Sequence, residues 1–155
     1  MHPFAHLSWY HLLLDAGVFL PLYVDLGHRG RSCRIMCLLA GGAGALIGSL
    51  LFSSRIQTVG MRGLSGISYG LMAVWAMEMV FDRRQSRAFN VIGALLLGFL
   101  FFTIAWEHAT GTHLLEFLLL DMVGTPIIGC HLGGVAGALT VYLMSRGVSL
   151  AARAE

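Results

Sequence analysis

The chain has 155 residues, of which 57% are hydrophobic and only 12% are charged. Soluble domains carry about 25% charged residues, so this composition excludes an ordinary soluble domain and predicts a membrane protein. We expect a single domain over residues 1–155, because membrane spans of about 20 residues each would take up most of that length. The formal net charge is +2, and all ten basic residues are arginines.

Five apolar runs, bounded by charged residues, glycine and proline, predict an all-α bundle of about five transmembrane helices. The runs cover residues 7–26, 33–52, 65–81, 88–106 and 126–145. Two arginines, Arg55 and Arg62, fall at one side of this arrangement, and the remaining arginines fall at the other. By the positive-inside rule, the arginine-rich side is expected to face the cytoplasm, which places the N-terminus outside. An N-terminus outside the cell is unusual for a chain that has an odd number of spans and no signal peptide. We therefore expect that an earlier helix of the bundle is missing.

The first run carries two ionisable residues, His11 and Asp15, which are four positions apart and therefore share a helix face. An ionisable group inside a span is energetically expensive and by default suggests a functional site. Most histidines lie near the outer helix ends, namely His2, His6, His11, His108, His113 and His131. We therefore expect any chemistry at the outer side.

The third run is the shortest, and it begins with a hydroxyl residue, Ser65, next to Gly66. A helix of this length spans about 25 Å, less than the hydrocarbon thickness of about 30 Å, so Ser65 is expected below the outer surface. Free backbone N–H groups in the first helical turn can stabilise an oxyanion. Ser65 is thus a candidate nucleophile, although an ordinary helix N-cap is the simpler alternative.

The stretch between the fourth and fifth runs, from Glu107 to Thr125, contains a short apolar patch at residues 114–120. This patch is too short to cross a bilayer, so it is expected to lie in the interface or to fold over the bundle as a lid. A surface helix without a role in chemistry is equally compatible with the pattern.

The last run places His131 on the same side and at a similar depth as Ser65, where it could act as general base. These patterns indicate no acid beside His131. Tyr69, one turn beyond Ser65, is expected to stack on the imidazole and orient it. Small-residue pairs, Gly66 with Gly70 and Gly134 with Ala138, predict close packing of the two helices.

Three segments together resemble the rhomboid family of intramembrane serine proteases. Gly63-Leu64-Ser65-Gly66 resembles the family's G-x-S-G motif, and His131-Leu132-Gly133-Gly134 resembles its C-terminal histidine motif. The segment with His6, His11 and Asp15 is similar to an H-x4-H-x3-N motif, in which the second histidine and the asparagine help to hold the oxyanion.

The resemblance implies a Ser65–His131 dyad and an oxyanion hole formed by His11, Asp15 and the backbone at Leu64 and Ser65. Asp15 stands where the family usually has asparagine, and a carboxyl group could serve there only when protonated. The short length, Trp106-Glu107 and Gly124-Thr125-Pro126 look most like the rhombosortase branch. That resemblance implies substrates with a C-terminal Gly-Gly tail anchor, cut at the periplasmic side of a bacterial inner membrane.

The expected partners are therefore a transmembrane or tail-anchored protein substrate and the lipid bilayer, with no nucleic acid. One alternative is a catalytically inactive rhomboid-like protein that binds transmembrane helices. Another is a metal or haem site built from the outer histidines, but the His11/Asp15 pair is the only helical ligand spacing. We accordingly expect neither a metal nor a cofactor.

Overall fold

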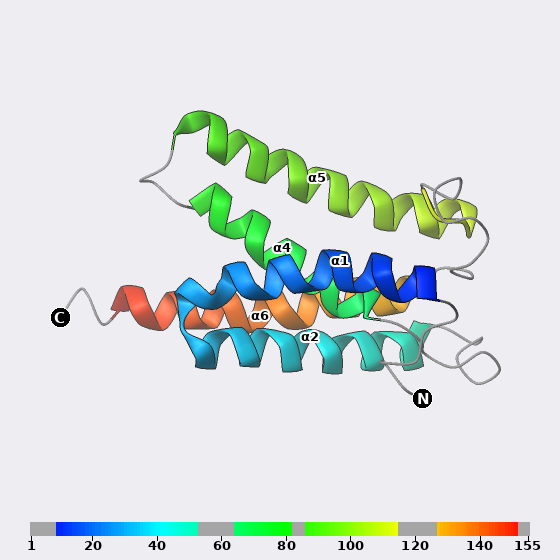
Figure 1. The fold of residues 1–155 in the computed structure, drawn as a ribbon, viewed down its shortest axis with the longest axis horizontal. Coiled ribbons are helices and arrows are strands. Elements are labelled where there is room, and N and C mark those ends of the chain that lie inside the picture. Colours follow the sequence, from blue (N-terminus) through cyan, green and yellow to red (C-terminus); the bar gives the residue numbers. More distant parts are fainter. Residues whose placement is uncertain (1–8, 53–63, 82–85, 115–126, 152–155) are drawn as a thin grey trace.

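The computed structural model describes residues 9–52, 64–81, 86–114 and 127–151. Figure 1 shows a bundle of helices. In chain order these are α1 (Trp9–Asp25), the 3-10 helix η1 (Leu26–Arg29), α2 (Arg31–Phe52), α4 (Ser65–Phe81), α5 (Arg87–Thr110) and α6 (Ile128–Ala151). The predicted all-α bundle of five helices is confirmed. The third predicted span and α4 share both ends, whereas α5 continues beyond residue 106 to Thr110.

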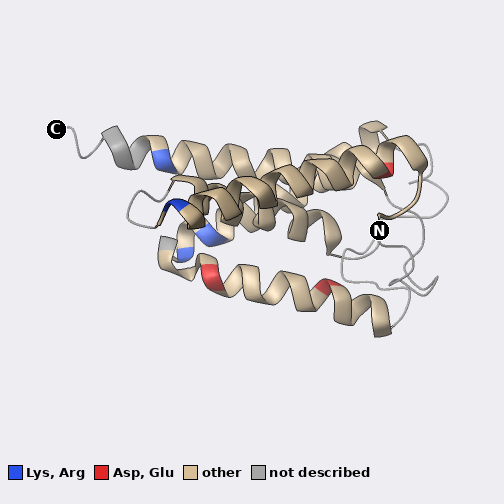
Figure 2. Cartoon of the chain, turned by 90° about the horizontal axis from the view of Figure 1, so that it is seen from above, with Lys and Arg blue, Asp and Glu red and all other residues tan. Residues whose placement is uncertain are grey.

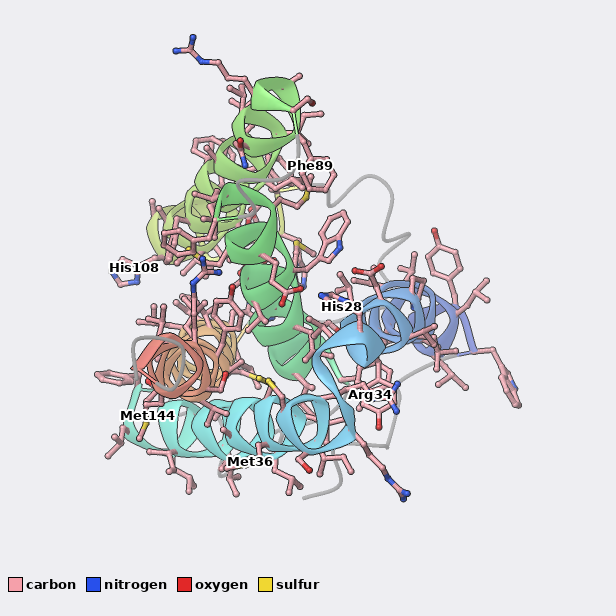
Figure 3. All side chains as sticks on the ribbon, turned by 90° about the vertical axis from the view of Figure 1, so that its left-hand side faces the viewer. His28, Arg34, Met36, Phe89, His108 and Met144 are labelled. Atoms are coloured by element: carbon pink, nitrogen blue, oxygen red, sulfur yellow. The ribbon has the colours of Figure 1, made fainter. Side chains whose placement is uncertain are left out.

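Helix α4 lies at the centre of the bundle, as the view along the helices in Figure 3 shows. It contacts α1, α2, α5 and α6, and ten of its 17 residues are buried. A helix covered on all sides must be apolar around its whole circumference, and Glu78 is the single charged residue of α4. Its 17 residues span about 26 Å, so the bilayer extends beyond at least one of its ends.

Within the described part of the chain, three helices are long and apolar enough to cross a membrane: Arg31–Phe52, Arg87–Thr110 and the Ile128–Gly147 part of α6. Large apolar side chains on these helices point outwards. Met36 on α2 and Met144 on α6, both labelled in Figure 3, are 56% and 67% exposed. Because such surfaces are stable in lipid rather than in water, this is a multi-pass membrane protein.

Helix α6 packs against α4 and α2 at backbone distance. A Cβ atom on Gly134 would collide with the carbonyl oxygen of Gly66, and one on Gly70 would press on the carbonyl oxygen of Gly134. Gly44 of α2 and Gly133 of α6 make the same kind of contact. Helix association in membranes depends on such small residues, because they allow the backbones to approach.

The arginines of the described residues gather at one end of the bundle, as Figure 2 shows. At this end α4 finishes and α5 begins. Arg146 of α6 donates a hydrogen bond to the carbonyl oxygen of Phe81 at 3.3 Å, and its guanidinium group lies 4.5 Å from the centre of the Phe81 ring. Ser65 and His131 lie near the starts of α4 and α6, at the opposite end.

Candidate active site

A cavity of about 300 Å³ lies at the end of the bundle opposite the arginines. Its walls include apolar side chains of α1, α4 and α5, among them Val18, Met72 and Phe99. The polar lining residues are His11, Asp15, Ser65, Ser68, Tyr69, Thr103, Glu107, His113 and His131. An apolar cavity with a few convergent polar groups is typical of a ligand or active site.

Ser65 and His131 face each other in this cavity. Ser65 is the first residue of α4, and its Oγ atom lies 3.3 Å from Nε2 of His131. His131 is one turn into α6 and only 3% exposed. The structure thus brings the predicted nucleophile and the predicted general base within reach of one proton transfer.

Glu107 is a site residue that the sequence patterns do not indicate. Its Oε2 atom lies 2.7 Å from Nδ1 of His131, so the expectation of no acid beside His131 is wrong. The physical reason is that α5 continues to Thr110, whereas the predicted span stops at residue 106. The added turn puts Glu107 on the buried face that also carries Leu100 and Thr103. The sequence did carry one indication of this role, because Glu107 is an ionisable residue directly at the end of an apolar span.

Tyr69 stacks on the imidazole of His131. The two ring centres are 4.0 Å apart, and the ring planes differ by 5°. Tyr69 lies one turn beyond Ser65 on α4, and the Gly66–Gly134 contact holds the two helices close. The nucleophile and the stacking ring therefore meet His131 from the same helix.

Asp15 binds the backbone immediately before the serine. The N–H group of Leu64 donates to Oδ2 of Asp15 at 2.6 Å, and Nε2 of His11 lies 3.5 Å from the same oxygen. Both side chains are buried on the face of α1 that packs against α4. In this arrangement the Leu64 N–H group, a predicted oxyanion donor, is directed at Asp15.

Several predicted features fall outside the described part of the chain. They are His6, Arg55, Arg62, Gly63 of the serine motif, the segment Gly124-Thr125-Pro126, and the apolar patch at residues 114–120 apart from Leu114, which lines the cavity. His113, just before the patch, does belong to the site, because its Nδ1 atom lies 3.1 Å from Oε1 of Glu107.

The described residues contain no group of three or more His, Cys, Asp or Glu side chains arranged to hold a metal ion. In that part of the chain, the histidines of the cavity pair with carboxylates instead. His11 lies beside Asp15, while His113 and His131 contact the two oxygens of Glu107.

The fold and the site define a multi-pass helical membrane protein with a serine–histidine pair at the start of its central helix. The model of the Rhomboid domain family matches residues 1–147. The chain therefore belongs to the rhomboid family, whose members are in general intramembrane serine proteases, although some are inactive. No curated protein and no solved structure matches the chain.

Proposed function

We propose that this protein is an intramembrane serine endopeptidase in which Ser65 is the nucleophile and His131 the general base. The observation that supports this proposal is the 3.3 Å separation of Ser65 Oγ and His131 Nε2 inside the cavity. Ser68 also lines the cavity, but it is Ser65 that contacts an imidazole. A serine hydroxyl is a weak nucleophile until an adjacent base removes its proton.

The reaction follows from this pair. As Ser65 Oγ bonds to the scissile carbonyl carbon, His131 Nε2 takes the hydroxyl proton. When the tetrahedral intermediate collapses, the carbon–nitrogen bond breaks, and His131 gives its proton to the leaving amine. An ester between Ser65 and the substrate remains. Water then attacks the ester carbon while His131 takes a proton from the water. When the bond between the acyl carbon and Ser65 Oγ breaks, His131 returns that proton to Oγ, which releases the new carboxyl terminus and restores the serine hydroxyl.

The oxyanion of the intermediate needs hydrogen-bond donors. The first N–H groups of α4 lack intrahelical acceptors and lie at the positive end of the helix dipole. Loss of one oxyanion donor typically lowers kcat by about 100- to 1000-fold. We assign this role to the backbone at Ser65 and Leu64 and to His11. Asp15 must release the Leu64 N–H group, or donate as a protonated acid, for the hole to be complete.

The cavity suits an apolar polypeptide. α1 and α5 flank it, and each packs mainly on α4, so we propose that a substrate helix enters laterally between them. The chain must unwind before cleavage, and small residues such as glycine favour unwinding because they are poor helix formers.

We further propose a rhombosortase-like substrate, a protein with a C-terminal Gly-Gly tail anchor. Support comes from the resemblance of Trp106-Glu107 and Gly124-Thr125-Pro126 to that branch. The arginines of the described residues gather at the end of the bundle where α4 finishes, whereas Ser65 begins α4. By the positive-inside rule this asymmetry supports the proposal that the serine faces the periplasm across a bacterial inner membrane.

Co-expression with a tail-anchored substrate of this type tests the proposal. The wild type is expected to release the substrate from its anchor, whereas Ser65→Ala and His131→Ala are not. Ser145→Ala and His28→Ala are matched controls, because both residues lie at the arginine end, and these variants are expected to process normally. Processing that continues unchanged in Ser65→Ala and His131→Ala would refute the dyad.

An inactive rhomboid-like protein that binds transmembrane helices is the second candidate. The contact between the Leu64 N–H group and Asp15 favours it, since that donor is already engaged. A fluorophosphonate probe, which reacts with activated serines, separates the two cases. An active enzyme is labelled and loses the label in Ser65→Ala, whereas an inactive binder stays unlabelled.

A further inference from the structure

We infer that Glu107 is a positioning residue that orients His131, which makes the site a Ser65–His131–Glu107 triad rather than a dyad. The inference rests on the proposed function. Its starting point is the 2.7 Å distance between Glu107 Oε2 and His131 Nδ1, the nitrogen that faces away from Ser65. Both side chains are buried, with Glu107 2% and His131 3% exposed.

The carboxylate selects the useful tautomer of the imidazole. A neutral imidazole carries one N–H group, and an ionised carboxylate can only accept a hydrogen bond. Glu107 therefore keeps the proton of His131 on Nδ1, which leaves the Nε2 lone pair directed at the Ser65 hydroxyl. When His131 takes the serine proton and becomes charged, the nearby negative charge stabilises it. The Nδ1 proton stays on the imidazole throughout.

The structure also explains how a buried carboxylate is held at this place. Unpaired buried charge is strongly unfavourable, but each oxygen of Glu107 has an imidazole partner: Oε2 contacts His131, and Oε1 contacts His113 at 3.1 Å. The backbone is fixed as well. Gly111, in a left-handed conformation with a φ of 70°, ends α5 and donates its N–H group to the carbonyl oxygen of Glu107.

A different role for Glu107 would be purely structural, with the carboxylate serving to hold His113 and the segment that follows α5. The two roles differ in what they predict. Positioning of His131 requires the Glu107–His131 contact, whereas holding the segment requires the Glu107–His113 contact. Variants at Glu107 and at His113 therefore separate them.

The test uses the full chain in proteoliposomes and measures two quantities: the rate of fluorophosphonate labelling and the tautomer of His131. The tautomer is read from ¹⁵N NMR of histidine-labelled protein, with the His131 signals assigned by their loss in His131→Gln. The variants are Glu107→Gln, Glu107→Asp and His113→Gln. Glu78→Gln is the matched control, because Glu78 is also buried and paired with a histidine, His28, but at the arginine end.

Glu107→Gln is expected to slow labelling by up to about 10,000-fold, the loss produced when the triad aspartate of a serine protease is replaced by asparagine. The Nδ1-protonated form of His131 should also lose its dominance. Glu107→Asp keeps the charge and should recover part of the rate. Glu78→Gln should stay within about threefold of the wild type, since it lies away from the site. His113→Gln leaves the carboxylate beside His131, so it should lose less rate than Glu107→Gln and should keep the Nδ1-protonated form of His131.

A Glu107→Gln rate close to that of the wild type, or an unchanged His131 tautomer in that variant, would overturn the inference. So would an equal loss of rate in His113→Gln and Glu107→Gln without a tautomer change. If the wild type itself is not labelled, the proposed protease activity fails. The tautomer comparison then still decides whether Glu107 orients His131.

Discussion

Ser65 and His131 lie 66 positions apart in the chain, yet the Oγ atom of one is 3.3 Å from the Nε2 atom of the other. The distance is set by the packing of α4 on α6. Gly66, directly after the serine, contacts Gly134, one turn beyond the histidine, through backbone atoms. Reaction geometry and helix packing are therefore coupled at this contact.

Replacement of Gly134 by alanine should damage both packing and reactivity. The new Cβ atom would collide with the carbonyl oxygen of Gly66, so the helices must separate. Overpacking of this kind typically costs about 1–3 kcal/mol of unfolding free energy. A displacement of about 1 Å can cost about 100-fold in rate. Thermal unfolding in detergent and fluorophosphonate labelling measure the two effects.

Gly98→Ala is the matched control for this experiment. Gly98 lies on α5, and nothing comes within 4 Å of a Cβ atom built there. Since alanine favours helix more than glycine by about 1 kcal/mol, the variant should be as stable as the wild type or slightly more so. If Gly134→Ala and Gly98→Ala destabilise the protein equally, the close Gly66–Gly134 contact does not contribute more to stability than an ordinary helix position.

Removal of the Tyr69 ring should make the orientation of the His131 imidazole less fixed, which lowers the reactivity of Ser65 without abolishing it. Aromatic pairs contribute about 1 kcal/mol beyond their buried area, which corresponds to about a fivefold change in rate. Tyr69→Leu should therefore label about fivefold more slowly, whereas Tyr69→Phe, which keeps the stacked ring, should remain closer to the wild type. Identical rates for the two variants would contradict a role for stacking.

Asp15→Asn is expected to increase reactivity at neutral pH. The amide oxygen can still accept the Leu64 N–H group, while the amide nitrogen can donate to an oxyanion that an ionised carboxylate would repel. A gain of about 3- to 10-fold in labelling rate is expected, equivalent to about 1 kcal/mol. A slower Asp15→Asn enzyme at neutral pH would contradict this account.

Orientation in the membrane can be measured with single cysteines. In a chain whose cysteines (Cys33, Cys37 and Cys130) have been replaced, His108→Cys reports the serine end and Ser32→Cys the arginine end. A membrane-impermeant maleimide added to intact cells should label the cysteine at position 108. The cysteine at position 32 should react only after permeabilisation. The reverse pattern would contradict the positive-inside assignment.

Helix positions could be predicted from the sequence because hydrophobic length is a local property. α4 begins and ends where its apolar run does, at Ser65 and Phe81. The end of α5 was harder to predict from the sequence. Residues 107–110 are polar or small but remain helical, and the helix ends only where Gly111 adopts a positive φ. A hydropathy criterion stops at the last apolar residue, whereas the backbone continues to the next residue that can terminate it.

The candidate site was predictable only in part. Ser65, Tyr69 and His131 follow from depth and spacing along single helices. The contact of Glu107 with His131 and that of Asp15 with Leu64 both join different helices, and no local pattern determines how those helices rotate about their axes. The preference of buried carboxylates for partners indicates that a contact must exist, but not with which residue.

The three side chains of the proposed triad come from three helices: Ser65 from α4, Glu107 from α5 and His131 from α6. α6 packs at backbone distance on α2 and α4, and α5 packs chiefly on α4, where a Cβ atom on Gly93 would press on the carbonyl oxygen of Ala76. We expect that a change in the tilt of α5 would move the carboxylate relative to the serine and the imidazole. The proposed activity should therefore respond to bilayer thickness, which influences helix tilt.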